Sequence, residues 1–310
     1  MLKLEGSTIF NHMRSQKPTY PFLSFFILFM LSAGCGGGAN ESGQSEGQLF
    51  SEAEQKIFKD ISKIIEDLPP PSVVPTTMQK LGAEYDESLT NDLNRLEEYL
   101  VDPKKAALNL GIYAADIGYL IAYDQVQESM EHMSACQKIA ENLGVATAFD
   151  LQMIEQYESA MNDHARLIQL LNETIVKAEK RLGDSDQIAN AGLVLTGSFI
   201  EGLYLAVTVI DNYHKIHKDK QSDKILEPLV KLVLEQEQPL IDIIALLKDI
   251  PSNQDLNRTI AELNILKLLY DGDLAEIEEQ LAANPNLVIT EEMLFDINLE
   301  VTRIRNDIIK

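Results

Sequence analysis

Two segments of this chain are apolar on every side when they are read as helices, and they constrain the fold more than any other feature. Residues 106–123 read AALNLGIYAADIGYLIAY, and residues 189–210 read ANAGLVLTGSFIEGLYLAVTVI. A helix without a polar face belongs in the centre of a domain, and glycine permits close approach of one backbone to another. We therefore expect the two segments to lie side by side in one core.

The remainder of the chain after residue 48 has helical periodicity, and strand-like alternation with turn dipeptides is missing. Asp102-Pro103 has the chemistry of a helix start, an acidic N-cap before a proline in the first turn. The sequence predicts an all-α fold, a multi-helix bundle or stacked helical hairpins around central helices at about 103–123 and 187–212. The expected helices are 51–68, 89–100, 103–143, 167–182, 186–217, 222–249 with a break or kink at Pro228 and Pro239, 253–270, 273–283 and 290–308.

A transmembrane interpretation of residues 189–210 is disfavoured, because Asn190 and Glu201 would then lie in lipid, where a charge is expensive. The segment near the N-terminus is different in kind. Its apolar run, Phe22 to Leu31, has ten residues, and a helix needs about 20 to cross a bilayer. With Arg14 and Lys17 upstream and small residues downstream, it is typical of a secretory signal. Met13 is a second candidate for the start of translation.

The residues Leu31-Ser32-Ala33-Gly34-Cys35 that follow the apolar run resemble the lipobox of bacterial lipoproteins, although Ser32 stands where many lipoboxes have leucine. The resemblance implies cleavage before Cys35, a thioether-linked diacylglycerol on its sulfur, and an N-acyl chain such as palmitate. Two or three chains anchor a protein stably. The alternative is that Cys35 remains an ordinary thiol. The expected organisation is a signal peptide at 1–34, a lipidated cysteine with a flexible tether at 35–48, and a helical domain at 49–310.

The chain is acidic, with 49 Asp and Glu against 26 Lys and Arg and a net charge of −23. Such a surface repels phosphate backbones, so nucleic-acid binding is excluded. If Cys35 is acylated, Cys136 is the other cysteine of the chain and has no partner for an intramolecular disulfide. His132, four residues before Cys136, would complete a thiol–imidazole pair, but an isolated helical cysteine is usually a small buried hydrophobe.

One carboxylate followed three residues later by tyrosine occurs in each apolar segment: Asp116 with Tyr119, and Glu201 with Tyr204. Paired carboxylates in a low-dielectric site suit acid–base chemistry or metal binding. The first interpretation is therefore a shared pocket in which the tyrosines are hydrogen-bond partners. The second is that each carboxylate belongs to a structural network, as buried ionisable groups often do.

The second candidate site is Asp211, His214 and His217, which lie at spacings of three on adjacent helical turns. Imidazole and carboxylate ligands suit zinc or copper, but two nitrogens and one carboxylate fall short of a closed tetrahedral shell. Neighbouring lysines also bring positive charge, which the end of a helix attracts through its dipole alone. No nucleotide-binding or hydrolase motif is present, so no cofactor is expected.

The stretch LNLGIYAADIGYLIAYDQVQESMEHM, followed by KIAENLGVATAFD, resembles a group of all-helical lipoproteins of Bacteroidota-type bacteria. The resemblance implies an outer-membrane lipid anchor that faces the periplasm or the cell surface, and it carries no catalytic residues. The expected function is a non-catalytic binding or scaffold module with an envelope protein or small ligand as partner. The alternative is an enzyme or metal-linked receptor that uses acidic residues between the central helices.

Overall fold

The structure is a computed structural model. It describes residues 59, 63–64, 72–144, 155–157, 159–160, 163–183, 188–216, 220–251, 254–284, 287 and 291–310. The chain divides into two units, Met1–Glu46 and Gly47–Lys310, and every described residue belongs to the second. The expected signal segment, Cys35 and most of the helix expected at 51–68 lie outside the described residues.

The described residues form helices and contain no strand, which confirms the all-α class. The longest helices are α5 (Pro103–Ala122), α8 (His164–Gly183), α9 (Ile188–Ile216) and α14 (Glu291–Ile309). The others are α3 (Val73–Lys80), α4 (Leu96–Tyr99), α6 (Val126–Asn142), α10 (Lys220–Leu234), α11 (Glu237–Asp249), α12 (Gln254–Leu269) and α13 (Ala275–Ala283). Two 3-10 turns, η1 (Glu87–Leu89) and η2 (Leu93–Arg95), precede α4, and a π-helical turn, η4 (Tyr270–Leu274), joins α12 to α13.

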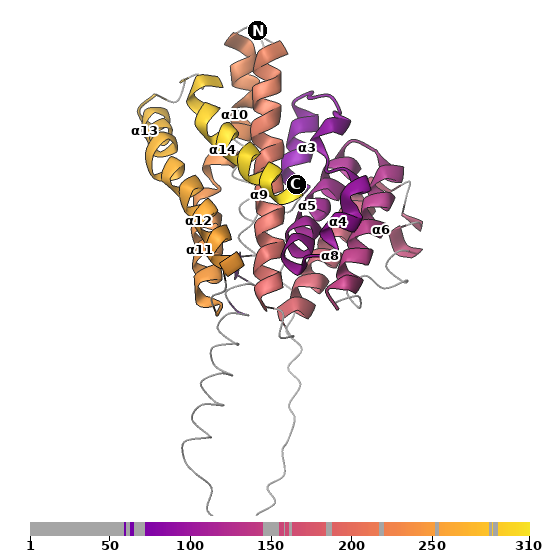
Figure 1. Ribbon diagram of the computed structural model, residues 1–310. Coiled ribbons are helices and arrows are strands. Elements are labelled where there is room, and N and C mark those ends of the chain that lie inside the picture. Colours follow the sequence, from indigo (N-terminus) through magenta and orange to yellow (C-terminus); the bar gives the residue numbers. More distant parts are fainter. Residues whose placement is uncertain are drawn as a thin grey trace, which may run out of the picture. The chain divides into compact units, whose positions relative to one another are not determined.

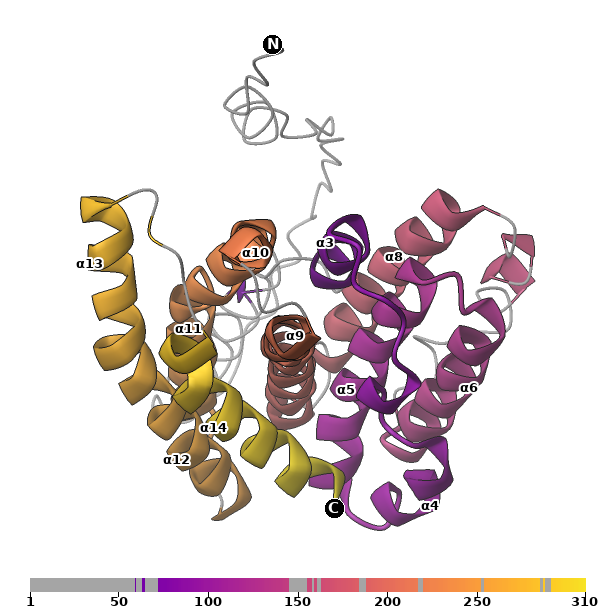
Figure 2. The same cartoon turned by 90° about the horizontal axis from the view of Figure 1, so that it is seen from above.

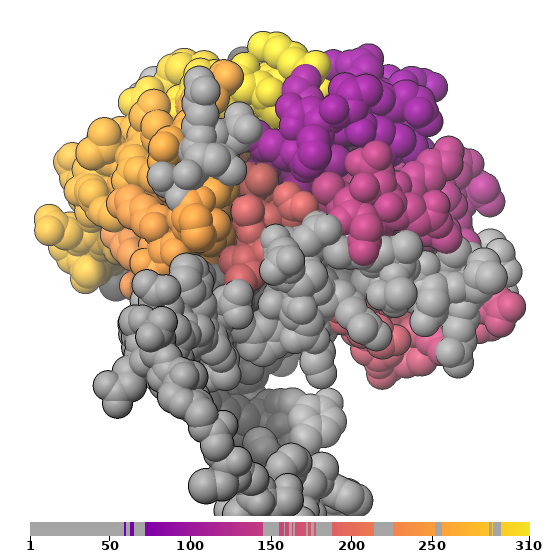
Figure 3. Space-filling model, turned by 60° about the horizontal axis from the view of Figure 1, so that its bottom comes forward, coloured from indigo at the N-terminus to yellow at the C-terminus, as the bar shows by residue number. Residues whose placement is uncertain are grey.

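Helix α9 is the centre of this arrangement, as predicted. It packs against α5 along much of its length and also against α3, α8, α10, α11 and α14. Viewed from above, α9 lies between α3, α5, α6 and α8 on one side and α10 to α14 on the other (Figures 1 and 2). In the space-filling view, the red surface of α9 emerges between the orange and the magenta helices (Figure 3).

Two glycines explain how closely α5 and α9 approach each other. A Cβ atom on Gly111 of α5 would lie 2.1 Å from the carbonyl oxygen of Val194, and one on Gly197 of α9 would lie 2.0 Å from that of Leu108. These separations are far below van der Waals contact, so neither position admits a side chain without movement of a backbone. The expectation that small residues bring the central helices together is confirmed.

The helix expected over 103–143 is two helices, and the interruption is at Asp124. Asp102 caps α5 as predicted, because its carboxylate accepts hydrogen bonds from the backbone N–H groups of Lys104 and Lys105. At the other end Asp124 has a φ of 58°, in the left-handed region. The Gln125 N–H then donates to the Leu120 carbonyl at 2.8 Å and closes the turn before α6.

Two other expected boundaries were wrong. The region 89–100 is not one helix: the end of η1, the turn η2 and the short helix α4 share it, because the side chains of Asp86 and Asp92 accept hydrogen bonds from nearby backbone N–H groups and compete with a regular helix. Between 222 and 249, the break lies after Leu234 at residues 235 and 236 and not at a proline. Pro228 lies inside α10, and Pro239 lies in the first turn of α11, where a missing N–H removes no helical hydrogen bond.

Within the part of the chain that is described, one helix is long and apolar enough to cross a membrane, Ile188–Tyr213 in α9. Of its most apolar stretch, 72 % is buried inside the protein. A central core helix meets the same length and hydropathy criteria, and the contacts of α9 with helices on both of its sides are those of a core helix.

Candidate functional site

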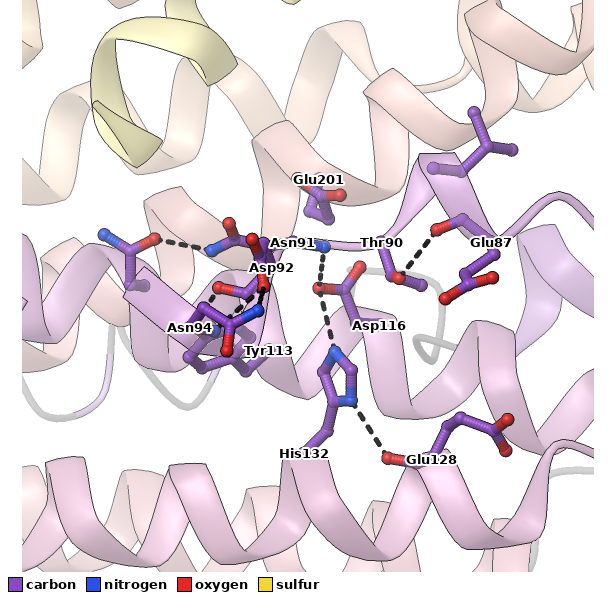
Figure 4. A network of polar contacts seen from close by, with 12 residues as sticks. Glu87, Thr90, Asn91, Asp92, Asn94, Tyr113, Asp116, Glu128, His132 and Glu201 are labelled. Carbon is purple, nitrogen blue, oxygen red and sulfur yellow. Dashed lines mark hydrogen bonds and ion pairs between the residues drawn. The ribbon is translucent and has the colours of Figure 1, made fainter. Parts of the chain in front are cut away.

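The carboxylates of Asp116 on α5 and Glu201 on α9 lie together in the core, where both residues are fully buried. The close crossing of the two helices brings these carboxylates together although they are far apart in the sequence. Asp116 Oδ2 accepts a hydrogen bond from the backbone N–H of Asn91 at 3.0 Å, whereas Oδ1 has no hydrogen-bond donor in the structure (Figure 4). Glu201 is held by a cation from a third helix.

That cation is Arg305 of α14, which is 5 % exposed. Its Nε lies 3.0 Å from Glu201 Oε2 and its Nη2 lies 3.1 Å from Oε1, so the pair is bidentate. Nη2 also donates to the carbonyl oxygen of Leu89 at 3.1 Å. The guanidinium lies 4.4 Å from the centre of the Tyr204 ring, within the range of a cation–π contact.

Arg305 was missed in the sequence interpretation, although a signal existed. It lies four residues after Val301 and eight after Ile297, both of which are buried in the core. A cation at this spacing therefore falls within the apolar stripe of α14. A charged residue in such a stripe is almost never fully buried without a partner, so it indicates a buried carboxylate elsewhere.

Burial shifts the pKa values of both carboxyl groups upward. Burial raises the pKa of Asp116 well above its ordinary value, and the negative charge of Glu201 beside it raises it further. Burial raises the pKa of Glu201 as well, but the Arg305 guanidinium offsets part of that rise. Two adjacent carboxylates in a low-dielectric site do not readily both ionise, and the pKa of Asp116 is the one raised well above its ordinary value, because Arg305 pairs with Glu201 and not with Asp116.

His132 of α6 completes the cluster on the far side of Asp116. Its Nδ1 lies 2.9 Å from the Glu128 carbonyl oxygen and donates to it, which leaves Nε2 without a proton. Nε2 is 3.9 Å from Asp116 Oδ2 and has no hydrogen-bond partner (Figure 4). Burial lowers the pKa of His132, so the ring is neutral at pH 7. The imidazole also makes an edge contact with Tyr113 at 5.4 Å between ring centres.

A second polar cluster adjoins the first through Asn91. The Asn91 amide nitrogen Nδ2 donates to Asn109 Oδ1 at 3.0 Å, and its Oδ1 accepts from the Tyr99 hydroxyl at 3.1 Å. The same hydroxyl lies 3.0 Å from the Ile309 carbonyl, and Asn109 Nδ2 donates to the Ile308 carbonyl at 3.3 Å. Side chains of α4 and α5 therefore bind carbonyl oxygens that the end of α14 leaves without helical partners.

The tyrosines of the predicted site have different roles. The Tyr119 hydroxyl accepts from the backbone N–H of Asp86 at 2.8 Å and lies 3.2 Å from its carbonyl oxygen, so it fixes the segment before η1. Tyr204 lies against Arg305. The structure thus brings together Asp116, Glu201 and Tyr204 around a cation that sequence interpretation did not include, whereas Tyr119 hydrogen-bonds elsewhere.

The other candidate residues are the Cys136 thiol and the 211–217 cluster. Cys136 is fully buried, and burial raises the pKa of its thiol. Asp211 is half-buried near the end of α9, whereas the side chain of His214 and the whole of His217 lie outside the described part of the chain. Among the described residues, no three His, Cys, Asp or Glu side chains gather as metal ligands would.

Comparison with protein-family models, with curated proteins and with solved structures gives no match for this chain. The geometry therefore carries the functional argument. The central groups of the cluster, Asp116, Glu201, Arg305 and His132, are at most 5 % exposed. Such an arrangement joins three helices, α5, α9 and α14, with α6 at its edge.

Proposed function

We propose that this chain is a lipid-anchored, non-catalytic helical binding or scaffold module of the bacterial cell envelope. Cys35 carries the lipid, and the helical unit stands off the outer membrane on the segment between residues 36 and 48. The signal-like run from Phe22 to Leu31 and the lipobox-like residues before Cys35 support the location. The net charge of −23 supports a single lipid attachment, because an acidic surface gains nothing from anionic headgroups.

The burial of the carboxyl cluster is the observation that supports a non-catalytic role. Asp116 and Glu201, the residues best suited to acid–base chemistry, are fully buried, and Arg305 occupies both oxygens of Glu201. A reacting group must come within hydrogen-bond reach of substrate. The buried pair of Glu201 and Arg305 instead stabilises the position of α14. The outer faces of the helices then remain for partners.

Metabolic labelling tests the anchor. In a didermic bacterial host fed an alkyne-tagged palmitate, the wild-type chain is expected to take up label and to remain with the membranes, and Cys35→Ala to do neither. Cys136→Ala is the matched control, because it removes the buried thiol and should leave labelling intact. Mass spectrometry of the N-terminal peptide identifies the modified atom. An unlabelled wild type, or a labelled Cys35→Ala, would contradict the proposal.

The competing function, an enzyme or receptor that uses the carboxyl cluster, has one observation in its favour. Asp116 Oδ1 and His132 Nε2 are buried polar atoms without a donor or acceptor, and such atoms often mark functional sites. Asp116→Asn preserves the shape of the site and the hydrogen bond from Asn91. Loss of a bound metabolite in a thermal-shift screen of this variant, with the fold intact by circular dichroism, would favour that function.

A further inference from the structure

In the part of the chain that the structure describes, the large exposed apolar side chains are concentrated on one pair of helices. Among the described residues, five large hydrophobic side chains are exposed, and four of them lie on α12 and α14: Ile265, Leu268, Phe295 and Leu299. Their exposed fractions run from 46 % to 67 %. The fifth, Val101, lies between α4 and α5. Single exposed hydrophobic residues need no explanation, but a cluster of them marks an interaction site.

The two helices that carry these residues are neighbours. Helices α12 and α14 pack against each other, and Arg303 of α14 forms an ion pair with Glu262 of α12 across the seam between them. Leu299 and Phe295 lie four and eight residues before Arg303, on one stripe of α14. The chain direction reverses between the two helices (Figure 1). We call these four exposed side chains on two packed helices the α12/α14 patch.

The border of the α12/α14 patch is acidic. Within four residues along the chain of its members, the acidic residues are Glu262, Asp271, Glu291, Glu292, Asp296 and Glu300, and the basic residues are Lys267 and Arg303. Both cations are already paired with carboxylates of this border, and the carboxylates outnumber the cations. Lys267 pairs with Asp271, and Arg303 pairs with Glu262, with Glu300 at 2.7 Å and with Asp307 at 3.2 Å.

We propose that the α12/α14 patch is the docking surface for a cationic amphipathic helix of another envelope protein. This inference rests on the proposed binding-module function and names its surface and the chemistry of its partner. An apolar helix face covers the four side chains, and lysine or arginine residues beside that face meet the acidic border. A second copy of this chain is a poor occupant, because it carries the same acidic border and a net charge of −23.

A designed peptide tests the surface. The probe is a helical peptide of leucine and lysine, about 18 residues long so that it forms a helix, and its twin has glutamate in place of lysine. Full-chain protein in nanodiscs of phosphatidylcholine is titrated with each labelled peptide, and fluorescence anisotropy reports binding. We expect saturable one-to-one binding of the lysine peptide, and binding of the glutamate twin that is weaker by roughly tenfold or more.

Two variants localise the binding. The double variant Leu268→Ser, Leu299→Ser removes apolar surface without a change of charge and should weaken binding of the lysine peptide by roughly tenfold, because a few apolar anchors dominate most interfaces. Val101→Ser is the matched control, since it removes the most exposed hydrophobic side chain outside the patch, and it should leave the affinity unchanged. Circular dichroism confirms that each variant folds.

Equal affinity of wild type and the double variant would overturn the proposal, as would equal binding of the two peptides. Sedimentation equilibrium provides a further check: self-association that the double variant abolishes would assign the patch to a second copy and overturn the cationic partner. The result of the peptide titration can be distinguished from that of the labelling experiment. If Cys35 proves unacylated, the protein does not enter nanodiscs and the same titration is performed on the free chain.

Discussion

Arg305 is the residue on which the buried cluster depends, because it is the cation that compensates Glu201. Loss of one partner from a buried pair leaves an uncompensated charge in a medium of low dielectric. The burial of both Arg305 and Glu201 distinguishes this pair from the surface ion pairs of Arg303, whose side chain is 40 % exposed. The two arginines lie two residues apart on α14 and provide a direct comparison.

We predict that Arg305→Met lowers the free energy of unfolding by about 3–5 kcal/mol, measured by chemical denaturation. Arg303→Met, the control, should change it by no more than about 1 kcal/mol, because solvent screens exposed pairs. The double variant Arg305→Met, Glu201→Met removes both charges and should recover much of the loss. Equal losses in the free energy of unfolding for the two single variants would show that the buried pair contributes no more to stability than the exposed pairs do.

Asp116 makes stability depend on pH. Because burial and Glu201 raise its pKa in the folded protein above the ordinary value of 3.8, the folded state binds the proton more tightly than the unfolded chain does. The contribution of Asp116 to stability is complete below pH 3.8 and is lost as pH rises toward the folded-state pKa. His132 acts in the opposite sense, since its lowered pKa weakens the fold as pH falls below 6.5.

Asp116→Asn should therefore gain stability relative to the wild type as pH rises from about 4 to 7, with a slope of up to about 1.4 kcal/mol per pH unit. Asparagine imitates the protonated carboxyl, because its oxygen can accept from Asn91 and its amide carries no charge beside Glu201. Urea unfolding across this pH range measures the difference. Parallel stability curves for the two proteins would mean that Asp116 is ionised in the folded state.

At the scale of elements, the crossing of α5 and α9 is decided by Gly111 and Gly197. Gly197→Ala would place a methyl group 2.0 Å from a backbone carbonyl oxygen, so the helices must separate, and we predict a loss of about 1–3 kcal/mol. The control in the same helix is Gly202→Ala, where nothing lies within 4 Å. That change should stabilise by about 0.5–1 kcal/mol through helix propensity. Thermal unfolding measures both, and equal shifts would contradict the close-contact explanation.

The elements that sequence predicted well are those with a local cause. The N-cap at Asp102 is such a case, because its carboxylate needs only the free backbone N–H groups two and three residues further along the chain. The turn at Asp124 was missed because aspartate adopts a positive φ only rarely. At Asp124, the packing of α6 against α5 favours a turn that the backbone preference of aspartate alone does not favour.

At the scale of the helical unit, the two groups of helices are joined across α9, and the last helix returns to the segment between residues 89 and 109. Helix α14 contacts α9 and α5, and Arg305, Ile308 and Ile309 form hydrogen bonds with Leu89, Asn109 and Tyr99. These bonds span more than half of the described sequence. They hold α14 in place and thereby fix the outer surface that α14 forms with α12.

The sequence by itself determined the all-α class, the central position of the two apolar helices and their close contact, because hydrophobic periodicity and small residues act along one helix. Only the tertiary structure decided that Asp116 and Glu201 lie together in the core, that Arg305 neutralises one of them, and that Tyr119 hydrogen-bonds elsewhere. Glu201 and Arg305 are 104 residues apart. Their pairing is set by how helices cross, since the free energy of a buried charge depends on neighbours that packing alone selects.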